Sequence, residues 1–286
     1  MALRLCRRCV AAFTVAIAMA AHAAPPPGLD GSADSLRAAW AALAESPDGY
    51  ATFEEPVRIA STQTSDEAGG LLYAIVDAPL PRIERALANA SAWCAVLILD
   101  PNVHRCSPRA ADVRVEFGES NTPVAFAFER SAHANDFLQM RLTAAKGPLG
   151  TTDYAIAFDA TPIDADRTLV RLAFSQRFGV GARIAMAAYF NTVGRGKVGF
   201  TIVDRDSAGR PSYARGLRGG VERNLMRYYF AILAYLDSLA APREEQPDRR
   251  VRTWLALTQR HPHQLQEDAG YFDRKSPEVR LQHAGE

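Results

Sequence analysis

A long amphipathic helix near the end of the chain is the feature that most constrains the fold. Apolar residues recur every three or four positions over residues 217–239, as they do on the buried face of a helix. The stripe consists of Val221, Leu225, Tyr228, Ile232, Tyr235 and Leu239, widened by Met226, Tyr229, Leu233 and Leu236. The side expected to face solvent carries Glu222, Arg223, Arg227 and Asp237. A face this wide needs a large partner surface to cover it.

Short apolar segments upstream of the helix supply that partner. Val113, Val115 and Phe117 alternate with polar residues, and turn signals rich in glycine, proline and aspartate separate one segment from the next. The predicted strands cover residues 56–62, 71–76, 113–117, 124–128, 137–142, 154–158 and 168–177. Alternating strands at hairpin spacing predict an antiparallel sheet with one buried face.

Further helices are predicted between and around the strands. One is expected to begin at Asp77–Leu80, with Asp77 as its cap, and to end near Trp93. Others are expected over residues 32–44, 181–193, 251–259 and 276–282, and a strand pair between residues 198–203 and the region of Tyr213. We expect a charged linker over residues 242–249 and regard the tail after it as an appendage.

The first 23 residues have the composition of a secretory signal peptide. Three arginines within the first eight residues precede an uncharged apolar run over residues 10–21, and Ala21-His22-Ala23 fits the small-residue rule of signal peptidase. The run is shorter than the roughly 20 residues that a membrane-spanning helix needs. A retained N-terminal anchor is the alternative. We therefore expect a secreted, periplasmic protein.

The charge of the chain argues against a nucleic-acid partner. With 33 basic and 32 acidic residues the formal net charge is +1, and it becomes −2 when residues 1–23 are removed. Binding to phosphate backbones needs a concentrated basic face. The expected organisation is a signal peptide (1–23), a leader with a short helix (24–54), one main domain (55–240), and a charged linker with a helical tail (241–286).

Two cysteines, Cys94 and Cys106, remain after the signal is removed. An even pair in an oxidising compartment favours a disulfide, which the loop-entropy model values at about 3 kcal/mol. Free thiols or a metal site are the alternatives. Because His104 is the one further candidate ligand nearby, the sequence does not support a zinc site.

Two strands, a short helix, a run of antiparallel strands and a long closing helix follow one another between residues 56 and 239. This order resembles the helix-grip fold of the START-like (SRPBCC) superfamily, which includes plant pollen allergens, lipid-transfer domains and aromatase/cyclase proteins. Several segments also resemble a group of uncharacterised exported bacterial proteins: Trp93-Cys94 to Cys106, Gly147–Gly150, Lys197–Phe200 and Glu222 to Tyr229. The inserted segment 181–203 departs from simpler members.

The resemblance implies an α+β fold in which a curved antiparallel sheet wraps around the long C-terminal helix, with a helical insertion and a helical tail. It also implies a cavity for an apolar ligand between the sheet and that helix. Its expected lining is Tyr154, Tyr189, Leu225, Tyr228, Tyr229 and Ile232, with Arg223, Arg227 and Lys197 as candidate headgroup contacts. A filled core is the alternative role for the aromatic residues, and a solvated face is the alternative for the arginines.

Common catalytic signatures do not occur in the sequence. It contains no G-x-S-x-G elbow, no H-E-x-x-H, no P-loop and no G-x-G-x-x-G dinucleotide fingerprint placed between a predicted strand and a helix. The close pair His261 and His263 falls in the expected tail without further metal ligands. We therefore expect no catalytic residue, no cofactor and no metal.

The favoured function is a non-enzymatic periplasmic carrier or sensor of a hydrophobic, lipid-like small molecule. The segment 181–193 also has enough apolar surface to make transient membrane contact. One alternative is an enzyme of the cyclase, isomerase or hydrolase type that uses Asp153, Tyr154 or an arginine in the same cavity. The other is an envelope interaction protein whose core is filled with side chains.

The signal peptide leads to a first prediction. When the protein is expressed with its own N-terminus in a Gram-negative host, the exported form should begin at Ala24, because signal peptidase cuts after small residues. Intact-mass measurement of the periplasmic fraction checks this. A membrane-bound form that keeps residues 1–23 would show instead that the segment is an anchor.

Overall fold

The computed structural model describes most of the chain after its N-terminal segment. The described residues are 32–45, 51–53, 56–110, 112–118, 123–132, 136–147, 150–192, 194–265, 267 and 270–285. The expected signal peptide and the proline-rich leader lie outside the described residues. None of the described helices is long and apolar enough to span a membrane.

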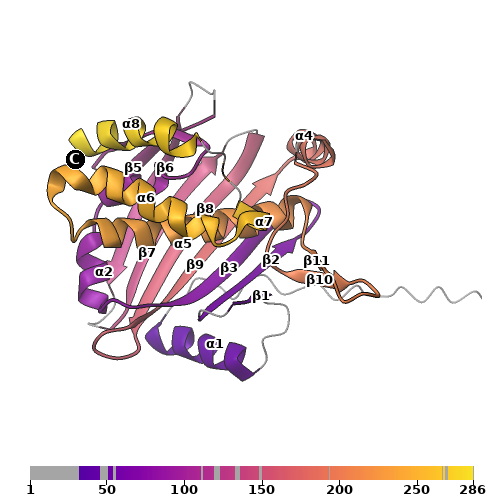
Figure 1. Cartoon of the computed structure of the whole chain (residues 1–286), viewed down its shortest axis with the longest axis horizontal. Helices are drawn as coiled ribbons and strands as arrows, with labels where there is room; N and C mark the ends of the chain where they lie inside the picture. Colours follow the sequence, from indigo (N-terminus) through magenta and orange to yellow (C-terminus); the bar gives the residue numbers. More distant parts are fainter. Residues whose placement is uncertain are drawn as a thin grey trace, which may run out of the picture.

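A nine-stranded antiparallel sheet is the central element (Figure 1). Its strand order is β1-β2-β3-β9-β8-β7-β6-β5-β4, so the pairing of β3 with β9 joins the two halves. The strands are β1 (Ala51–Thr52), β2 (Val57–Gln63), β3 (Glu67–Val76), β4 (Val103–Pro108), β5 (Asp112–Phe117), β6 (Val124–Ala132), β7 (Leu138–Lys146), β8 (Thr151–Pro162) and β9 (Thr168–Phe178). Strand β4 was not predicted, because its sequence does not alternate between apolar and polar residues.

Helix α5 (Gly216–Ser238) lies across one face of the sheet and contacts β2, β3 and β9. The helix approaches β3 closely at Gly70, where a Cβ atom would stand 2.8 Å from Val221 Cγ1 and 2.9 Å from Leu225 Cδ1. Any larger residue at position 70 would therefore push the helix away. The predicted α+β helix-grip arrangement is confirmed: the sheet packs around one long C-terminal helix.

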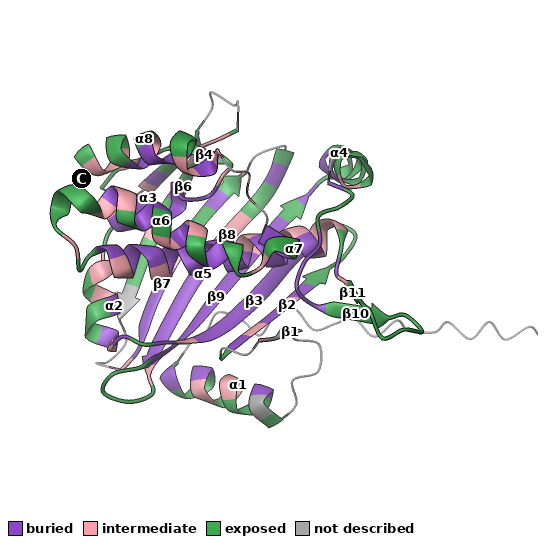
Figure 2. Ribbon diagram, viewed as in Figure 1, coloured by how far each residue is buried: buried purple, intermediate pink, exposed green. Residues whose placement is uncertain are grey.

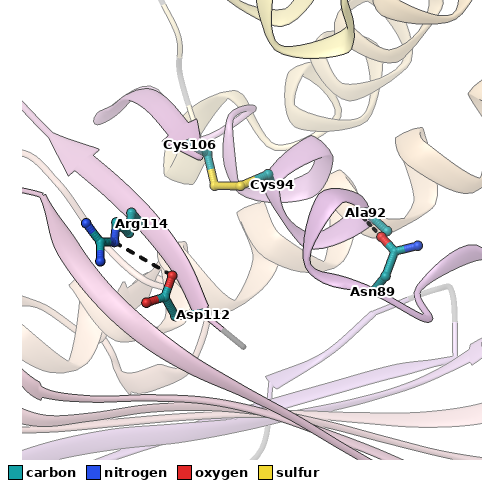
Figure 3. Close-up of a disulfide and its surroundings, with 6 residues drawn as sticks. All are labelled: Asn89, Ala92, Cys94, Cys106, Asp112 and Arg114. Atoms are coloured by element: carbon teal, nitrogen blue, oxygen red, sulfur yellow. Dashed lines mark hydrogen bonds and ion pairs between the residues drawn. A yellow bond between two sulfur atoms is a disulfide. The ribbon is translucent and has the colours of Figure 1, made fainter. Parts of the chain in front are cut away.

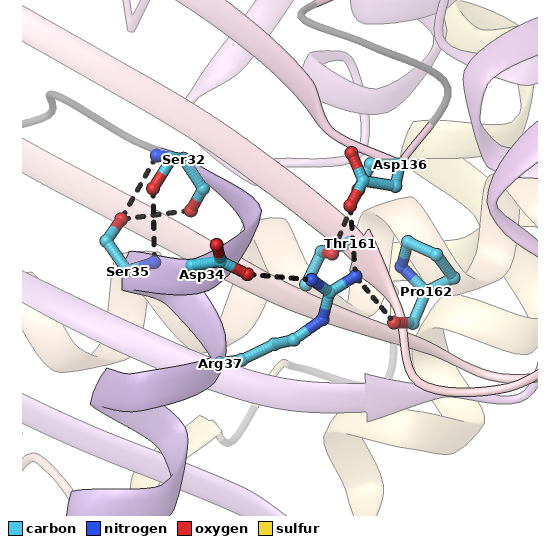
Figure 4. Close-up of polar contacts among 7 residues, drawn as sticks. All are labelled: Ser32, Asp34, Ser35, Arg37, Asp136, Thr161 and Pro162. Atoms are coloured by element: carbon cyan, nitrogen blue, oxygen red, sulfur yellow. Dashed lines mark hydrogen bonds and ion pairs between the residues drawn. The ribbon is translucent and has the colours of Figure 1, made fainter.

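Helix α1 (Ala33–Glu45) covers the opposite face of the sheet and forms a second, smaller apolar cluster there through Leu36. Arg37 fastens this helix to the sheet (Figure 4). Its guanidinium donates to Asp136 Oδ2 at 3.3 Å and to the main-chain carbonyl of Pro162 at 3.5 Å. The short helix expected near the N-terminus thus packs on the main domain.

Two helices stand where one was expected over residues 77–93. Helix α2 (Leu80–Ala86) begins after Pro79 without a side-chain cap, so the expected capping role of Asp77 is wrong. Helix α3 (Ala90–Leu97) begins at Asn89, whose side chain accepts a hydrogen bond from the Ala92 amide at 3.0 Å (Figure 3). A new cap starts a new helix.

The predicted disulfide between Cys94 and Cys106 is present (Figure 3). It links α3 to β4, and both half-cystines are buried, at 0% and 3% exposed. The bond therefore connects β4, the edge strand of the sheet, to α3, the helix that precedes it in the chain.

The C-terminal segment is part of the main core and not an appendage. Helix α6 (Gln246–Gln259) packs on α5, and helix α8 (Tyr271–Ala284) packs on α6 and β4. Trp254 is fully buried, stacks on Tyr271 at 4.7 Å and donates to the carbonyl of Arg227 at 3.2 Å. Where a charged linker was expected, a short 3-10 helix (Arg243–Glu245) and the first turn of α6 occur.

The remaining elements lie at the N-terminal end of α5. They are α4 (Val180–Asn191), the hairpin of β10 (Ile202–Arg205) and β11 (Pro211–Tyr213), and the short α7 (Pro262–Leu265). The inserted helix and the strand pair were both predicted. In Figure 2 the outer sides of α4 and of the hairpin are mostly exposed, whereas α5 is buried along most of its length.

The contact between α5 and the sheet leads to the second prediction. Leu225→Ala or Ile232→Ala should lower the free energy of unfolding by about 2–5 kcal/mol, because both side chains are almost fully buried. Leu239→Ala is the control, since Leu239 is 38% exposed at the end of the same helix. Urea unfolding followed by circular dichroism measures the difference. Unchanged stability at both core positions would contradict the observed packing.

Candidate functional site

A pocket of about 600 Å³ lies between α4, the first half of α5 and the adjoining ends of β8 and β9. The turn before β4 and a residue of the C-terminal segment, Glu267, complete its wall. Ligand sites of small molecules commonly have volumes of roughly 300–1,000 Å³. The pocket is thus large enough for a small organic molecule.

Aromatic and aliphatic side chains form much of the pocket wall. Phe174 comes from β9, Met186 and Phe190 from α4, and Val221 from α5. The Tyr154 ring meets Phe174 edge-on, with ring centres 5.1 Å apart. This wall can remove apolar ligand surface from water.

A β-bulge places Tyr154 at the pocket. Between Thr152 and Ala155 strand β8 carries one residue more than β9, and Asp153 adopts a φ of 51°. A bulge turns side chains relative to the regular alternation. Burial raises the pKa of Tyr154 above its usual value, and the charge of Asp100 adds to the effect. The phenol therefore stays protonated and can donate a hydrogen bond.

Arg223 and Arg227 lie one turn apart on α5 and line the pocket. They are only 7% and 8% exposed, so the expectation that they face solvent is wrong. The cause is the C-terminal segment: Arg223 donates to the main-chain carbonyl of Gln264, and Arg227 forms an ion pair with Glu267. Sequence periodicity could not reveal this cover, because it comes from residues about 40 positions away.

Two details of these arginines bear on binding. Burial, together with the charge of Arg227, lowers the pKa of Arg223 to about 10. The Nε of Arg227 is buried without a hydrogen-bond partner in the described part of the chain. With a pKa of about 10, Arg223 remains charged near neutral pH. One carboxylate, that of Glu267, is paired with the two guanidinium groups among the described residues.

Lys197 and Tyr189 stand together at the exposed side of the pocket. The Lys197 ammonium donates to the Tyr189 hydroxyl at 2.6 Å, and both residues line the pocket. Within the pocket the structure thus brings together five of the residues singled out from the sequence, namely Tyr154, Tyr189, Lys197, Arg223 and Arg227.

Four other expected lining residues lie outside this pocket. Leu225, Tyr228 and Ile232 are buried in the core against the sheet. Tyr229 borders a separate recess of about 520 Å³ beside Arg82 and Leu233. The sequence could not place these four residues, because an apolar stripe on a helix can face either a packed core or a cavity.

The sequence analysis missed several pocket residues, among them Asn102, Phe174, Gln176, Asn224 and Glu267. Gln176 is a polar residue that is buried near the end of a strand, which is a signal that could have drawn attention to it. For Glu267 no local pattern exists. Within the described ranges, no three His, Cys, Asp or Glu side chains gather as metal ligands would.

Glu222 has a structural role that the sequence did not indicate. Although expected to face solvent, it is fully buried and its carboxylate accepts three hydrogen bonds. The donors are Ser61 Oγ at 2.5 Å and the amides of Phe200 and Thr201 at 2.6 and 2.9 Å. These bonds fasten the segment after α4 to α5 and to β2, and so hold one side of the pocket in place.

Comparisons with known proteins were made for the whole chain. No family model matches it, and no curated protein matches it. Solved structures similar in part include norcoclaurine synthase from Thalictrum flavum with a transition state analogue, at 14% identity, covering 46% of this chain and 89% of that one, with a TM-score of 0.33. Another is the Zhui aromatase/cyclase from Streptomyces sp. R1128, at 14% identity. The match covers 64% of this chain and 93% of that one, with a TM-score of 0.34.

A third similar structure is human STARD10, at 8% identity. The match covers 58% of this chain and 76% of that one, with a TM-score of 0.36. These neighbours are START/Bet v1-like helix-grip proteins, the group that the sequence resembles. At such TM-scores the likeness supports no inference about a ligand or an activity. The helix-grip assignment of this chain rests on its own sheet and on α5.

The buried carboxylate leads to the third prediction. Glu222→Gln should lower the free energy of unfolding by about 2–4 kcal/mol, because a charged acceptor is lost and an amide group then faces the donors. Asp237→Asn is the matched control on the same helix, since the Asp237 ion pair with Arg249 lies near the surface and should contribute about 0–1 kcal/mol. Denaturant unfolding compares the two variants. An equal loss of unfolding free energy in both variants would show that the Glu222 hydrogen bonds stabilise the fold no more than a surface ion pair does.

Proposed function

We propose that this protein binds a small amphipathic molecule, with an apolar body and one acidic group, in the pocket between α4 and α5. It carries or senses this molecule without changing it chemically. The observation that carries the proposal is one pocket of about 600 Å³ that joins an aromatic wall to two buried arginines.

The apolar wall supports binding of a hydrophobic body. Burial of apolar surface contributes roughly 25 cal/mol per Å². Met186 and Phe190 of α4 line the pocket together with Phe174 and Tyr154 of the sheet, so a ligand there would contact apolar side chains of both the helix and the sheet. This supports the hydrophobic ligand expected from the sequence.

The charges around the pocket support an acidic group on the ligand. Among the described residues around the pocket, Lys197, Arg223 and Arg227 are basic, whereas Glu267 and the nearby Asp100 are acidic, which leaves one excess positive charge. Within the described ranges, Arg223 has a main-chain carbonyl as its hydrogen-bond acceptor and no carboxylate. A buried cation is unfavourable unless it is paired. A carboxylate or phosphate group of the ligand would supply the missing partner.

The arrangement favours binding over catalysis. Asp153, one of the residues considered for an enzyme, is exposed and does not line the pocket. Among the described lining residues the one carboxylate is Glu267, and it is paired with Arg227. Tyr154 stays protonated and can act as a donor to a ligand. The pocket also weighs against the alternative of a completely filled core.

A periplasmic location belongs to the proposal. It is supported by the signal-like segment of residues 1–23 and by the disulfide between Cys94 and Cys106. Disulfides persist in the periplasm and are rare in the cytosol. Extraction of the protein from its native host, followed by mass spectrometry, would identify the bound molecule.

The fourth prediction concerns the acidic group. The probes are dansyl-undecanoic acid and its methyl ester, followed by dansyl fluorescence. We expect the protein to bind the acid more tightly, and Arg223→Met to weaken acid binding by roughly tenfold or more while leaving the ester unaffected.

Arg85→Met is the control, because Arg85 is an exposed arginine of α2 far from the pocket lining. Equal affinity of the unaltered protein for acid and ester would contradict the role given to the arginines. Failure to bind either probe, with no molecule recovered from native protein, would contradict the proposed function.

A further inference from the structure

Large apolar side chains are exposed mainly in one part of the described structure. Eight such side chains are at least 38% exposed, and five of them fall between residues 180 and 203. These five are Val180 (63%), Ile184 (64%) and Tyr189 (39%) of α4, and Ile202 (42%) and Val203 (52%) of β10. Exposed apolar residues that gather in this way mark an interaction surface.

Helix α4 and the β10–β11 hairpin lie at the same end of the molecule (Figure 1). Phe190 of α4 packs against Gly220, where a Cβ atom would stand 3.3 Å from its Cζ. Strand β11 ends at Tyr213, three residues before α5 begins. Both elements therefore flank the N-terminal end of α5, and Figure 2 shows their outer sides as exposed.

The same segment has a strong positive charge. Residues 180–218 contain seven basic and two acidic residues, a net charge of +5, although the whole chain has only +1. Among the seven, Arg210 alone forms an ion pair in the described part of the chain. The exposed side chains of Arg195 and Arg215 have neither an ion pair nor a hydrogen bond there. The remainder of the sequence carries −4.

We propose that this end of the molecule docks on an anionic lipid bilayer. The docking surface consists of the exposed apolar residues Val180, Ile184, Ile202 and Val203 and the exposed basic residues Arg195, Lys197 and Arg215 of the same stretch of chain. Apolar side chains enter the headgroup region of a bilayer, and basic residues around them are attracted to its negative surface. The apolar residues come from two separate elements, which suits a soft planar partner that accepts each insertion independently.

Docking in this way orients the pocket. Tyr189 of α4 and Lys197, which follows α4, both line the pocket. Both also lie within residues 180–203, the stretch that carries five exposed apolar residues. The exposed side of the pocket would therefore face the lipid. An amphipathic ligand could then move between bilayer and pocket without crossing water, while the remaining, acidic part of the chain stays in solution.

The fifth prediction tests this docking by vesicle co-sedimentation of the exported protein. The vesicles contain phosphatidylcholine alone or an equal mixture with phosphatidylglycerol. We expect roughly tenfold tighter binding to the anionic vesicles, with a preference that falls as salt is added. Ile184→Gln with Val203→Gln should weaken binding to the anionic vesicles by roughly tenfold.

Two further variants separate charge from apolar contact. Arg195→Gln with Arg215→Gln should reduce the preference for anionic vesicles by roughly tenfold. Leu281→Gln is the matched control: Leu281 is 70% exposed, but it lies on α8, outside the docking surface. It should bind like the unaltered protein. All variants should keep the melting temperature, because the altered side chains are exposed.

Several outcomes would overturn the docking proposal. These are no binding to anionic vesicles, an equal loss in Leu281→Gln, or unchanged binding in the Ile184 and Val203 double variant. If size-exclusion chromatography instead shows that the unaltered protein is a dimer and the double variant a monomer, with unchanged vesicle binding, the surface is an interface between copies of this chain. Binding of the dansyl acid without vesicles should be unchanged in the double variant, so failure here is distinct from failure of the proposed function.

Discussion

The close approach of α5 to β3 at Gly70 is the contact on which the other features of the structure depend. With no side chain at that position, Val221 and Leu225 reach the sheet, and the apolar stripe of the helix is buried along most of its length. Burial of a stripe this long is the main source of favourable free energy that such a fold has. The pocket forms beside this contact, where α4 and the first half of α5 stand apart from the ends of β8 and β9.

The polar side of α5 is also buried, and this gives the pocket its charge. Glu222 is held by three donors, whereas Arg223 and Arg227 are covered by Gln264 of α7 and by Glu267. A carboxylate that accepts three hydrogen bonds is well compensated. The positive charges of Arg223 and Arg227 are compensated less completely, and both residues line the pocket that a ligand would fill. One helix face thus combines a structural carboxylate with a candidate anion site.

The overall charge of the chain conceals a local asymmetry. A net charge of +1 gives no sign of a surface partner, yet residues 180–218 carry +5 and also most of the exposed large apolar side chains. Electrostatic attraction to a membrane depends on the charge within about one Debye length, or about 8 Å at physiological ionic strength, and not on the total. A near-neutral total charge is therefore compatible with a small basic surface.

Local periodicity in the sequence determined the α+β class, most strands, the inserted helix and the closing helix, because side-chain spacing reports directly on the buried face of each element. The cysteine pair and its bridge were also readable from the sequence. The tertiary structure alone decided which side chains of α5 are exposed to solvent: Glu222, Arg223 and Arg227 are buried by residues distant in the chain. It also decided that Leu225 and Ile232 belong to the core while Tyr154 and Tyr189 reach the pocket. Periodicity shows that a face is covered only when the covered residues are apolar, and it never shows what covers them.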